Sequence, residues 1–116
     1  MSMWQGQRIE EIGVVDADAG REHVVLLDVR EAREWEGGHA PGATWIPMAD
    51  VPNARFQLPI NRRIACICRS GQRSARAASE LVQMGFDAVN VTGGMRAWAA
   101  HGLPVVRDDG SPGEVV

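Results

Sequence analysis

The residues with the clearest chemical potential in this chain are Cys68 and the six residues that follow it. They read Cys-Arg-Ser-Gly-Gln-Arg-Ser, and the thiol comes directly after an apolar run. Three arginines follow the thiol before the first carboxylate: Arg69, Arg73 and Arg76. Nearby positive charge and the N-terminus of a helix both favour a thiolate, the nucleophilic form of cysteine. The spacing therefore predicts a reactive thiol, and the alternative is a buried, inert cysteine.

The overall charge restricts what such a thiol would act on. The chain has 116 residues and a formal net charge of −3, although all twelve of its basic residues are arginine. Nucleic acids and anionic membranes are normally bound by a basic excess, so we expect neither as a partner. An anion site here would be built from guanidinium groups and backbone amides. The length fits one domain with a single core.

Cysteine usage and hydropathy indicate the compartment. Cys66 and Cys68 are the only cysteines, too few for the disulfide framework of a small secreted domain. Residues 1–10 lack the apolar core of a secretory signal. No run approaches the roughly 20 apolar residues of a membrane span. We therefore expect a soluble protein of the reducing cytoplasm.

Three apolar runs, two of them rich in β-branched residues, predict the strands that position the thiol. They are residues 24–29, 64–67 and 88–91, and each is typical of a strand covered on both faces in a parallel sheet. Between the last two, apolar residues at helical spacing predict a helix that begins near Ser74 and ends at Gly85. Strand, helix and strand in this order form a right-handed βαβ unit. The predicted fold class is α/β.

Weaker patterns predict the remaining elements. They are a short helix over 31–36, a strand over 44–46, a helix or loop over 48–59 and a helix over 95–101. Trp98 shares a face of the last helix with Met95 and Ala99, which predicts core packing rather than a cofactor site. Residues 107–116 are expected to form a loose tail.

Ligands of open α/β sheets bind beyond the carboxyl ends of the strands. Asp28 and Arg30 lie at the end of the first strong strand and Cys68 at the end of the second, so we expect them to be neighbours. Gly71 can adopt backbone angles that let successive N–H groups converge above the sulfur. Together with the helix N-terminus and the arginines, these amides would form an anion cradle.

A thiolate in such a cradle has two plausible targets. Attack on a sulfane sulfur would leave a persulfide on Cys68, whose anionic sulfur the same amides would stabilise. Attack on a phosphoryl group would require a wider cradle. The number of residues in the loop separates the two reactions.

The chain resembles the single-domain rhodaneses, the thiosulfate sulfurtransferases, over residues 24–105. The matching motifs are Leu-Asp-Val-Arg-Glu at 27–31, Gly-His-Ala-Pro-Gly-Ala at 38–43, the Cys68 loop at 68–74, Gly-Phe at 85–86, Gly-Gly at 93–94 with Trp98, and Gly-Leu-Pro at 102–104. The resemblance implies one rhodanese-like domain over residues 1–106, with a central five-stranded parallel sheet and helices on both faces. It also implies that Cys68 carries the sulfur.

The resemblance assigns roles to the other residues as well. It implies a catalytic Cys68 and a substrate-binding loop made of Arg69, Ser70, Gly71, Gln72, Arg73 and Ser74. Arg73 resembles the residue that contacts the oxyanion end of the donor. Asp28 and Arg30 would form a supporting ion pair, and His39 would be structural.

Loop length and the thiol distinguish the activities found on this fold. Sulfurtransferases of the family have a six-residue loop, here residues 68–73. Related dual-specificity phosphatases and arsenate reductases have Cys-x5-Arg, and Ser74 stands where that arginine would be. Rhodanese-like domains also serve as non-catalytic binding or regulatory modules, which often lack the cysteine.

The expected partners follow from the persulfide chemistry. We expect a small anionic sulfur donor such as thiosulfate, cyanide as an acceptor in vitro, and a thiol acceptor such as thioredoxin, glutathione or a sulfur-carrier protein. No metal or cofactor is expected. Cys66 is interpreted as a small buried residue. A redox pair with Cys68, about 6.6 Å away along the same face, is the alternative.

Overall fold

A computed structural model describes residues 8–116, and its centre is a five-stranded parallel sheet. The strands are β1 (Glu11–Ile12), β2 (Val24–Asp28), β3 (Thr44–Trp45), β4 (Arg63–Ile67) and β5 (Ala88–Val91). Their spatial order is β1-β5-β4-β2-β3, and every neighbouring pair is parallel. This confirms the predicted α/β class and places β4, which leads to Cys68, at the centre of the sheet.

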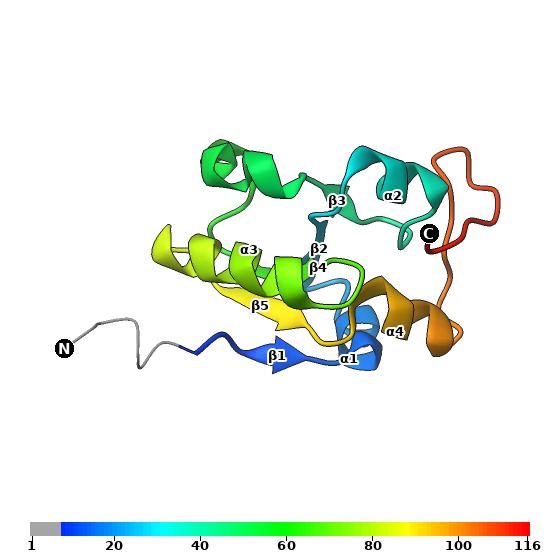
Figure 1. Cartoon of the computed structure of the whole chain (residues 1–116). Helices are drawn as coiled ribbons and strands as arrows, with labels where there is room; N and C mark the ends of the chain where they lie inside the picture. Colours follow the sequence, from blue (N-terminus) through cyan, green and yellow to red (C-terminus); the bar gives the residue numbers. More distant parts are fainter. Residues whose placement is uncertain (1–7) are drawn as a thin grey trace.

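The helices connect successive strands or follow the last of them, and they lie on the faces of the sheet (Figure 1). They are α1 (Val14–Ala19), α2 (Ala32–Gly37), α3 (Gln72–Gln83) and α4 (Gly94–Ala100), with two 3₁₀ helices, η2 (Met48–Asn53) and η3 (Arg55–Gln57). Residues 48–59, expected to be a helix or loop, thus form short 3₁₀ turns. Within residues 8–116, no helix has the length and hydropathy needed to span a bilayer.

Side chains of β4 alternate between two hydrophobic cores, one on each face of the sheet. Ile64 and Cys66 pack with α3 and η2, whereas Ala65 and Ile67 pack with α1 and α4. In Figure 1, α3 lies on one side of the sheet and α1 and α4 lie on the other. Both faces are covered, which explains why the sequence of this strand is continuously apolar. Trp98 is fully buried, as predicted.

The sequence patterns did not predict β1 or α1. Glu11 and Ile12 are only two residues, and they pair with Asn90 and Val91 of β5. A strand this short has no periodicity to detect, and its stability comes from its neighbour. The α3 helix also starts at Gln72, two residues before its predicted beginning near Ser74.

The C-terminal segment, expected to be loose over residues 107–116, is instead hydrogen-bonded to the loop after α2. Val106 pairs with His39 and with Pro112, and the Glu114 amide donates to the Gly37 carbonyl at 2.9 Å. The neighbouring Val115 packs against the core that contains Trp98. The segment turns back because its backbone groups and valines find partners there, and Figure 1 shows it beside α2.

The N-terminus of α4 fixes the loop that follows β4. The amide of Met95 donates to the carbonyl of Cys68 at 2.7 Å, and the amide of Arg96 donates to the carbonyl of Arg69 at 3.0 Å. Gly94 makes this approach possible, since a Cβ there would lie 2.4 Å from the Cys68 carbonyl oxygen. The position of the thiol therefore depends on close contact with α4.

We predict that Gly94→Ala lowers the free energy of unfolding much more than Gly102→Ala. Both glycines have positive φ, +59° and +74°, so each alanine incurs the left-handed penalty of about 1–2 kcal/mol. Only the Gly94 variant adds a steric clash, because nothing lies within 4 Å of a Cβ at Gly102. Urea unfolding should show an additional loss of about 2 kcal/mol or more for Gly94→Ala. Equal losses would contradict the close-contact argument.

Candidate active site

The thiol of Cys68 lies at the carboxyl end of β4, beneath the loop that leads into α3. The residue is 1% exposed. The amide of Gly71 donates to Sγ at 3.1 Å, and the hydroxyl of Ser74 lies 3.2 Å from Sγ. Gly71 has a φ of +110°, a conformation that favours glycine and turns its amide toward the sulfur. The structure thus brings Gly71 and Ser74 to the thiol.

These contacts stabilise the thiolate. Burial raises the pKa of the Cys68 thiol, but hydrogen bonds from the Ser74 side chain and from the backbone at Ser74, Gly71 and Ser70 outweigh it. The net result is a pKa below the ordinary value for cysteine. These hydrogen bonds therefore favour the thiolate, the nucleophilic form of cysteine.

A buried side chain from β5 holds the cradle in place. Asn90 is 3% exposed, and its Oδ1 lies 2.6 Å from the Ser74 hydroxyl. Its Nδ2 donates to the Gly71 carbonyl at 3.0 Å and to Glu11 at 3.4 Å. The single hydroxyl proton of Ser74 can be donated either to Asn90 or to the sulfur, and an anionic sulfur is the stronger acceptor. Asn90 thus lies against both groups that contact the sulfur, and its bond to the Gly71 carbonyl holds the loop whichever way the Ser74 proton points.

The two arginines of the loop have different surroundings. Arg73 donates from Nη1 and Nη2 to the two carboxylate oxygens of Glu34, at 2.7 and 2.8 Å. Arg69 is exposed, and its Nε donates to the Val116 carbonyl at 2.9 Å. Ser70 and Gln72 are exposed at the rim. The loop therefore carries one paired and one exposed guanidinium group.

Asp28 and Arg30 form a buried ion pair beside this loop. Both are fully buried, and Arg30 Nη2 donates to Asp28 Oδ2 at 2.8 Å. The same nitrogen donates to the Gly38 carbonyl at 2.8 Å, so the pair ties the end of β2 to the turn after α2. Asp28 and Arg30 were expected to form a supporting ion pair, and the structure shows such a pair between them.

A buried, activated thiol at the carboxyl end of the central strand can attack an electrophilic sulfur or phosphorus atom. Comparison with known families identifies the domain that carries it. The profile of the Rhodanese-like domain matches residues 12–101. The chain belongs to the rhodanese family. The match begins within β1, at Ile12, and includes α1, an element that the sequence patterns did not predict.

Individual rhodanese relatives agree in extent and fold. A protein of Allochromatium vinosum named sulfurtransferase is 41% identical over 93 residues, covering 79% of this chain and 87% of its own. A Bacillus subtilis protein named putative sulfurtransferase YtwF is 40% identical over 90 residues, covering 78% and 84%. The crystal structure of a rhodanese-related protein from Thermoplasma volcanium has a TM-score of 0.79 and 33% identity, covering 84% of this chain and 97% of its own.

Two other residues singled out in the sequence, Cys66 and His39, are both buried in this rhodanese. Cys66 is fully buried and free, and burial raises the pKa of its thiol to about 12. His39 is buried, stacks on Trp35 with ring centroids 3.5 Å apart, and places Nδ1 3.0 Å from the Trp35 carbonyl oxygen. Among the described residues, no three His, Cys, Asp or Glu side chains gather as a metal site.

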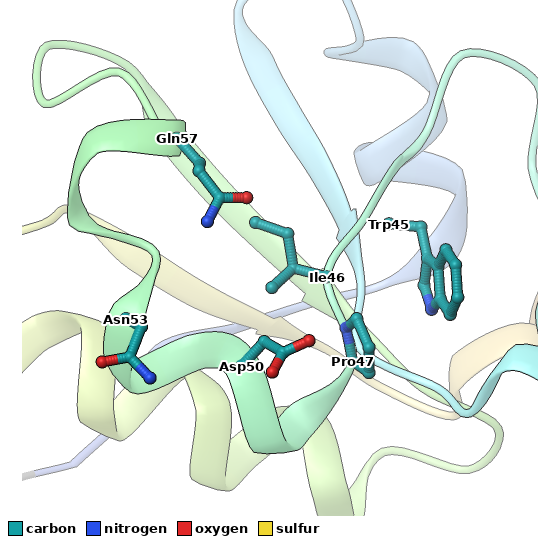
Figure 2. A pocket seen from close by; sticks show the side chains of 6 residues that line it. All are labelled: Trp45, Ile46, Pro47, Asp50, Asn53 and Gln57. Atoms are coloured by element: carbon teal, nitrogen blue, oxygen red, sulfur yellow. The ribbon is translucent and has the colours of Figure 1, made fainter.

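A surface hollow of about 340 Å³ lies beside β3 and the 3₁₀ helices (Figure 2). Its lining residues are Trp45, Ile46, Pro47, Asp50, Asn53 and Gln57. None of them belongs to the Cys68 loop or contacts the sulfur. The hollow is therefore separate from the reactive thiol.

Sequence reasoning missed two residues that shape the site, Glu34 and Asn90. Asn90 carried a detectable signal, because it is the only polar residue in an otherwise apolar strand, and a polar residue in a buried strand requires a partner. The sequence signal at Glu34 is weaker. Glu34 lies three residues after Glu31, and the two side chains form a capping box at the start of α2. Neither signal identifies the partner in the loop.

We predict that Ser74→Ala raises the pKa of Cys68, because the Ser74 hydroxyl makes the strongest of the stabilising hydrogen bonds. The rate of alkylation as a function of pH reports the thiolate fraction. Its midpoint should lie below that of an ordinary cysteine in the wild type and move upward in Ser74→Ala. Only one thiol per chain should react rapidly, since burial raises the pKa of Cys66 to about 12. An unchanged midpoint, or two fast thiols, would contradict this description of the cradle.

We also predict that Glu34 contributes stability that is lost in acid. Hydrogen bonds from Arg73 lower the pKa of this carboxyl from 4.5 to about 2, against the opposing effect of burial. Because the folded pKa lies below the unfolded one, the contribution is complete above pH 4.5 and disappears as the pH falls toward 2. It amounts to about 3 kcal/mol at most.

Urea unfolding at a series of pH values checks this contribution. Glu34→Gln should be less stable than the wild type at neutral pH, and the difference should shrink as the pH falls from 4.5 toward 2. Glu36 is an exposed residue of the same helix, and Glu36→Gln should follow the wild type. A constant difference between Glu34→Gln and the wild type would show that the carboxyl does not titrate in this way.

Proposed function

We propose that this rhodanese is a sulfurtransferase that moves a sulfane sulfur from thiosulfate or a similar donor to a thiophilic acceptor. The supporting observation is the Cys68 sulfur, which accepts hydrogen bonds from the loop and has a pKa below the ordinary value for cysteine. The same donors would stabilise a terminal persulfide sulfur, which is also anionic. The names of the relatives, which assign sulfur transfer to those proteins, agree with this proposal.

The first half-reaction loads the thiol. The Cys68 thiolate attacks the outer sulfur of thiosulfate, the S–S bond of the donor breaks, and sulfite leaves with the electron pair. The product is a Cys68 persulfide. Arg69 and the hydrogens of Arg73 that Glu34 does not use are the cationic groups that would face the departing anion.

The second half-reaction unloads the persulfide. A thiolate or cyanide attacks the terminal sulfur, and the Cys68 thiolate leaves and is restored. In the cell the acceptor would be a thiol such as thioredoxin, glutathione or a sulfur-carrier protein. Two free thiols, one of them activated, suit a reducing compartment such as the cytoplasm.

The cradle favours this reaction over phosphate ester hydrolysis. Phosphatases of the related type use an arginine at the position of Ser74 to bind the phosphoryl oxygens. Here Ser74 is fully buried, and its hydroxyl lies against the sulfur. We accordingly expect no Cys68-dependent hydrolysis of an aryl phosphate. The presence of an activated thiol likewise argues for catalysis over a purely binding role.

The proposal predicts a persulfide that forms on Cys68 and is removed by an acceptor. The reduced protein should gain one sulfur atom in intact mass after incubation with excess thiosulfate, and cyanide should remove it as thiocyanate. Cys68→Ser should show neither event. Cys66→Ala should retain both, because Cys66 lies fully buried in β4.

Failure of the wild type to gain sulfur from thiosulfate and from an organic persulfide would contradict sulfur transfer and favour a binding module. Gain of sulfur by Cys68→Ser would place the persulfide on another residue.

A further inference from the structure

Glu34 holds the arginine that closes the Cys68 loop. Its two carboxylate oxygens accept hydrogen bonds from the two Nη atoms of Arg73, in a bidentate arrangement. The Glu34 side chain is 10% exposed and the Arg73 side chain is 37% exposed. The contact joins α2 to the first turn of α3, beside the thiol.

The position of Glu34 does not depend on Arg73 alone. Its Oε1 also accepts a hydrogen bond from the Glu31 amide at 3.0 Å, as part of the capping box of α2. Hydrogen bonds from Arg73 lower the pKa of Glu34, and burial opposes them. The hydrogen bond from the Glu31 backbone lowers the pKa further, and the result is a pKa of about 2. A full negative charge therefore lies beside Arg73 at neutral pH.

This negative charge changes the charge balance of the site. Arg69 and Arg73 are the two cationic residues of the loop, and Glu34 offsets one of them. The exposed Glu31 adds a further negative potential at Arg73. The thiolate itself is anionic when a donor arrives. A dianion such as thiosulfate therefore meets little net attraction, whereas a donor with one charge or none is penalised less.

We propose that Glu34 is a specificity-determining residue that makes an organic persulfide, R–S–SH, a better donor than thiosulfate. The inference rests on the proposed sulfur transfer and names the donor class. The Cys68 thiolate attacks the outer sulfur of R–S–SH, the donor S–S bond breaks, and R–S⁻ leaves with the electron pair. The proton of the new Cys68 persulfide then passes to R–S⁻, which leaves a persulfide anion in the cradle and a free thiol R–SH.

The test compares two small donors in a single turnover. Thiosulfate is a dianion, and 2-hydroxyethyl persulfide has the persulfide as its only ionisable group. The second-order rate constant for the gain of one sulfur atom on Cys68 is measured by intact mass, with Cys68→Ser as the background. The wild type should react faster with 2-hydroxyethyl persulfide.

Glu34→Gln should change the ratio of the two rates. The thiosulfate rate should rise by about tenfold and the persulfide rate by about twofold or less, as expected when one charge near a dianion is removed. The matched control is Glu36→Gln, which removes the same charge from the exposed side of α2 and should leave the ratio unchanged. Glu31→Gln, which does not remove the Arg73 contact, should shift the ratio in the same direction by a smaller factor. Glu31→Gln replaces Glu34→Gln as the test variant if Glu34→Gln does not fold.

The outcomes separate this inference from the proposed function. In one outcome, the wild type forms the Cys68 persulfide while Glu34→Gln, or a folded Glu31→Gln, has the same ratio of the two donor rates. That result overturns the role of Glu34 and leaves the proposed function standing. A fall in the thiosulfate rate of Glu34→Gln also overturns it, since that result would mean that the ion pair serves to orient Arg73 for the dianion. A wild type that gains sulfur from neither donor overturns the proposed function and this inference with it.

Discussion

The structure around the thiol depends on one backbone constraint. Amides that converge on the Cys68 sulfur leave the carbonyl groups of the same loop pointing away from it, and buried carbonyl groups need partners. The first turn of α4 supplies two of these partners through the amides of Met95 and Arg96. Asn90 supplies another through its contact with the Gly71 carbonyl. The placement of α4 and β5 against the loop therefore helps to position the Cys68 thiol.

Two ion pairs join α2 to this framework, and they differ in burial. Asp28 and Arg30 are fully buried, and Arg30 also holds the turn at Gly38, so its charge is compensated where water has no access. In the second pair, Glu34 is nearly buried and Arg73 is partly exposed at the edge of the site. The first pair fixes the architecture. The second places a negative charge beside Arg73, at the edge of the Cys68 loop.

Much of the fold could be predicted from local patterns. The strand over residues 88–91 has the predicted bounds, and Trp98 lies in the core as its helical face indicated. Elements without a local pattern were missed, namely β1 and α1. The segment over 107–116 was expected to be loose, but its partners lie about 70 residues earlier, near His39. Local composition does not encode a partner at that distance.

By itself, the sequence determined the local surroundings of the thiol. The sequence has a thiol at the end of an apolar strand, a glycine three residues later and then a helix. These features are sufficient to predict amides that converge on sulfur, because they lie within a few consecutive residues. Only the tertiary structure decided what surrounds that sulfur. Arg73 meets a carboxylate 39 residues away, and Ser74 meets Asn90 from the next strand. These contacts arise when α2 and β5 pack beside the loop, and that packing depends on the whole core.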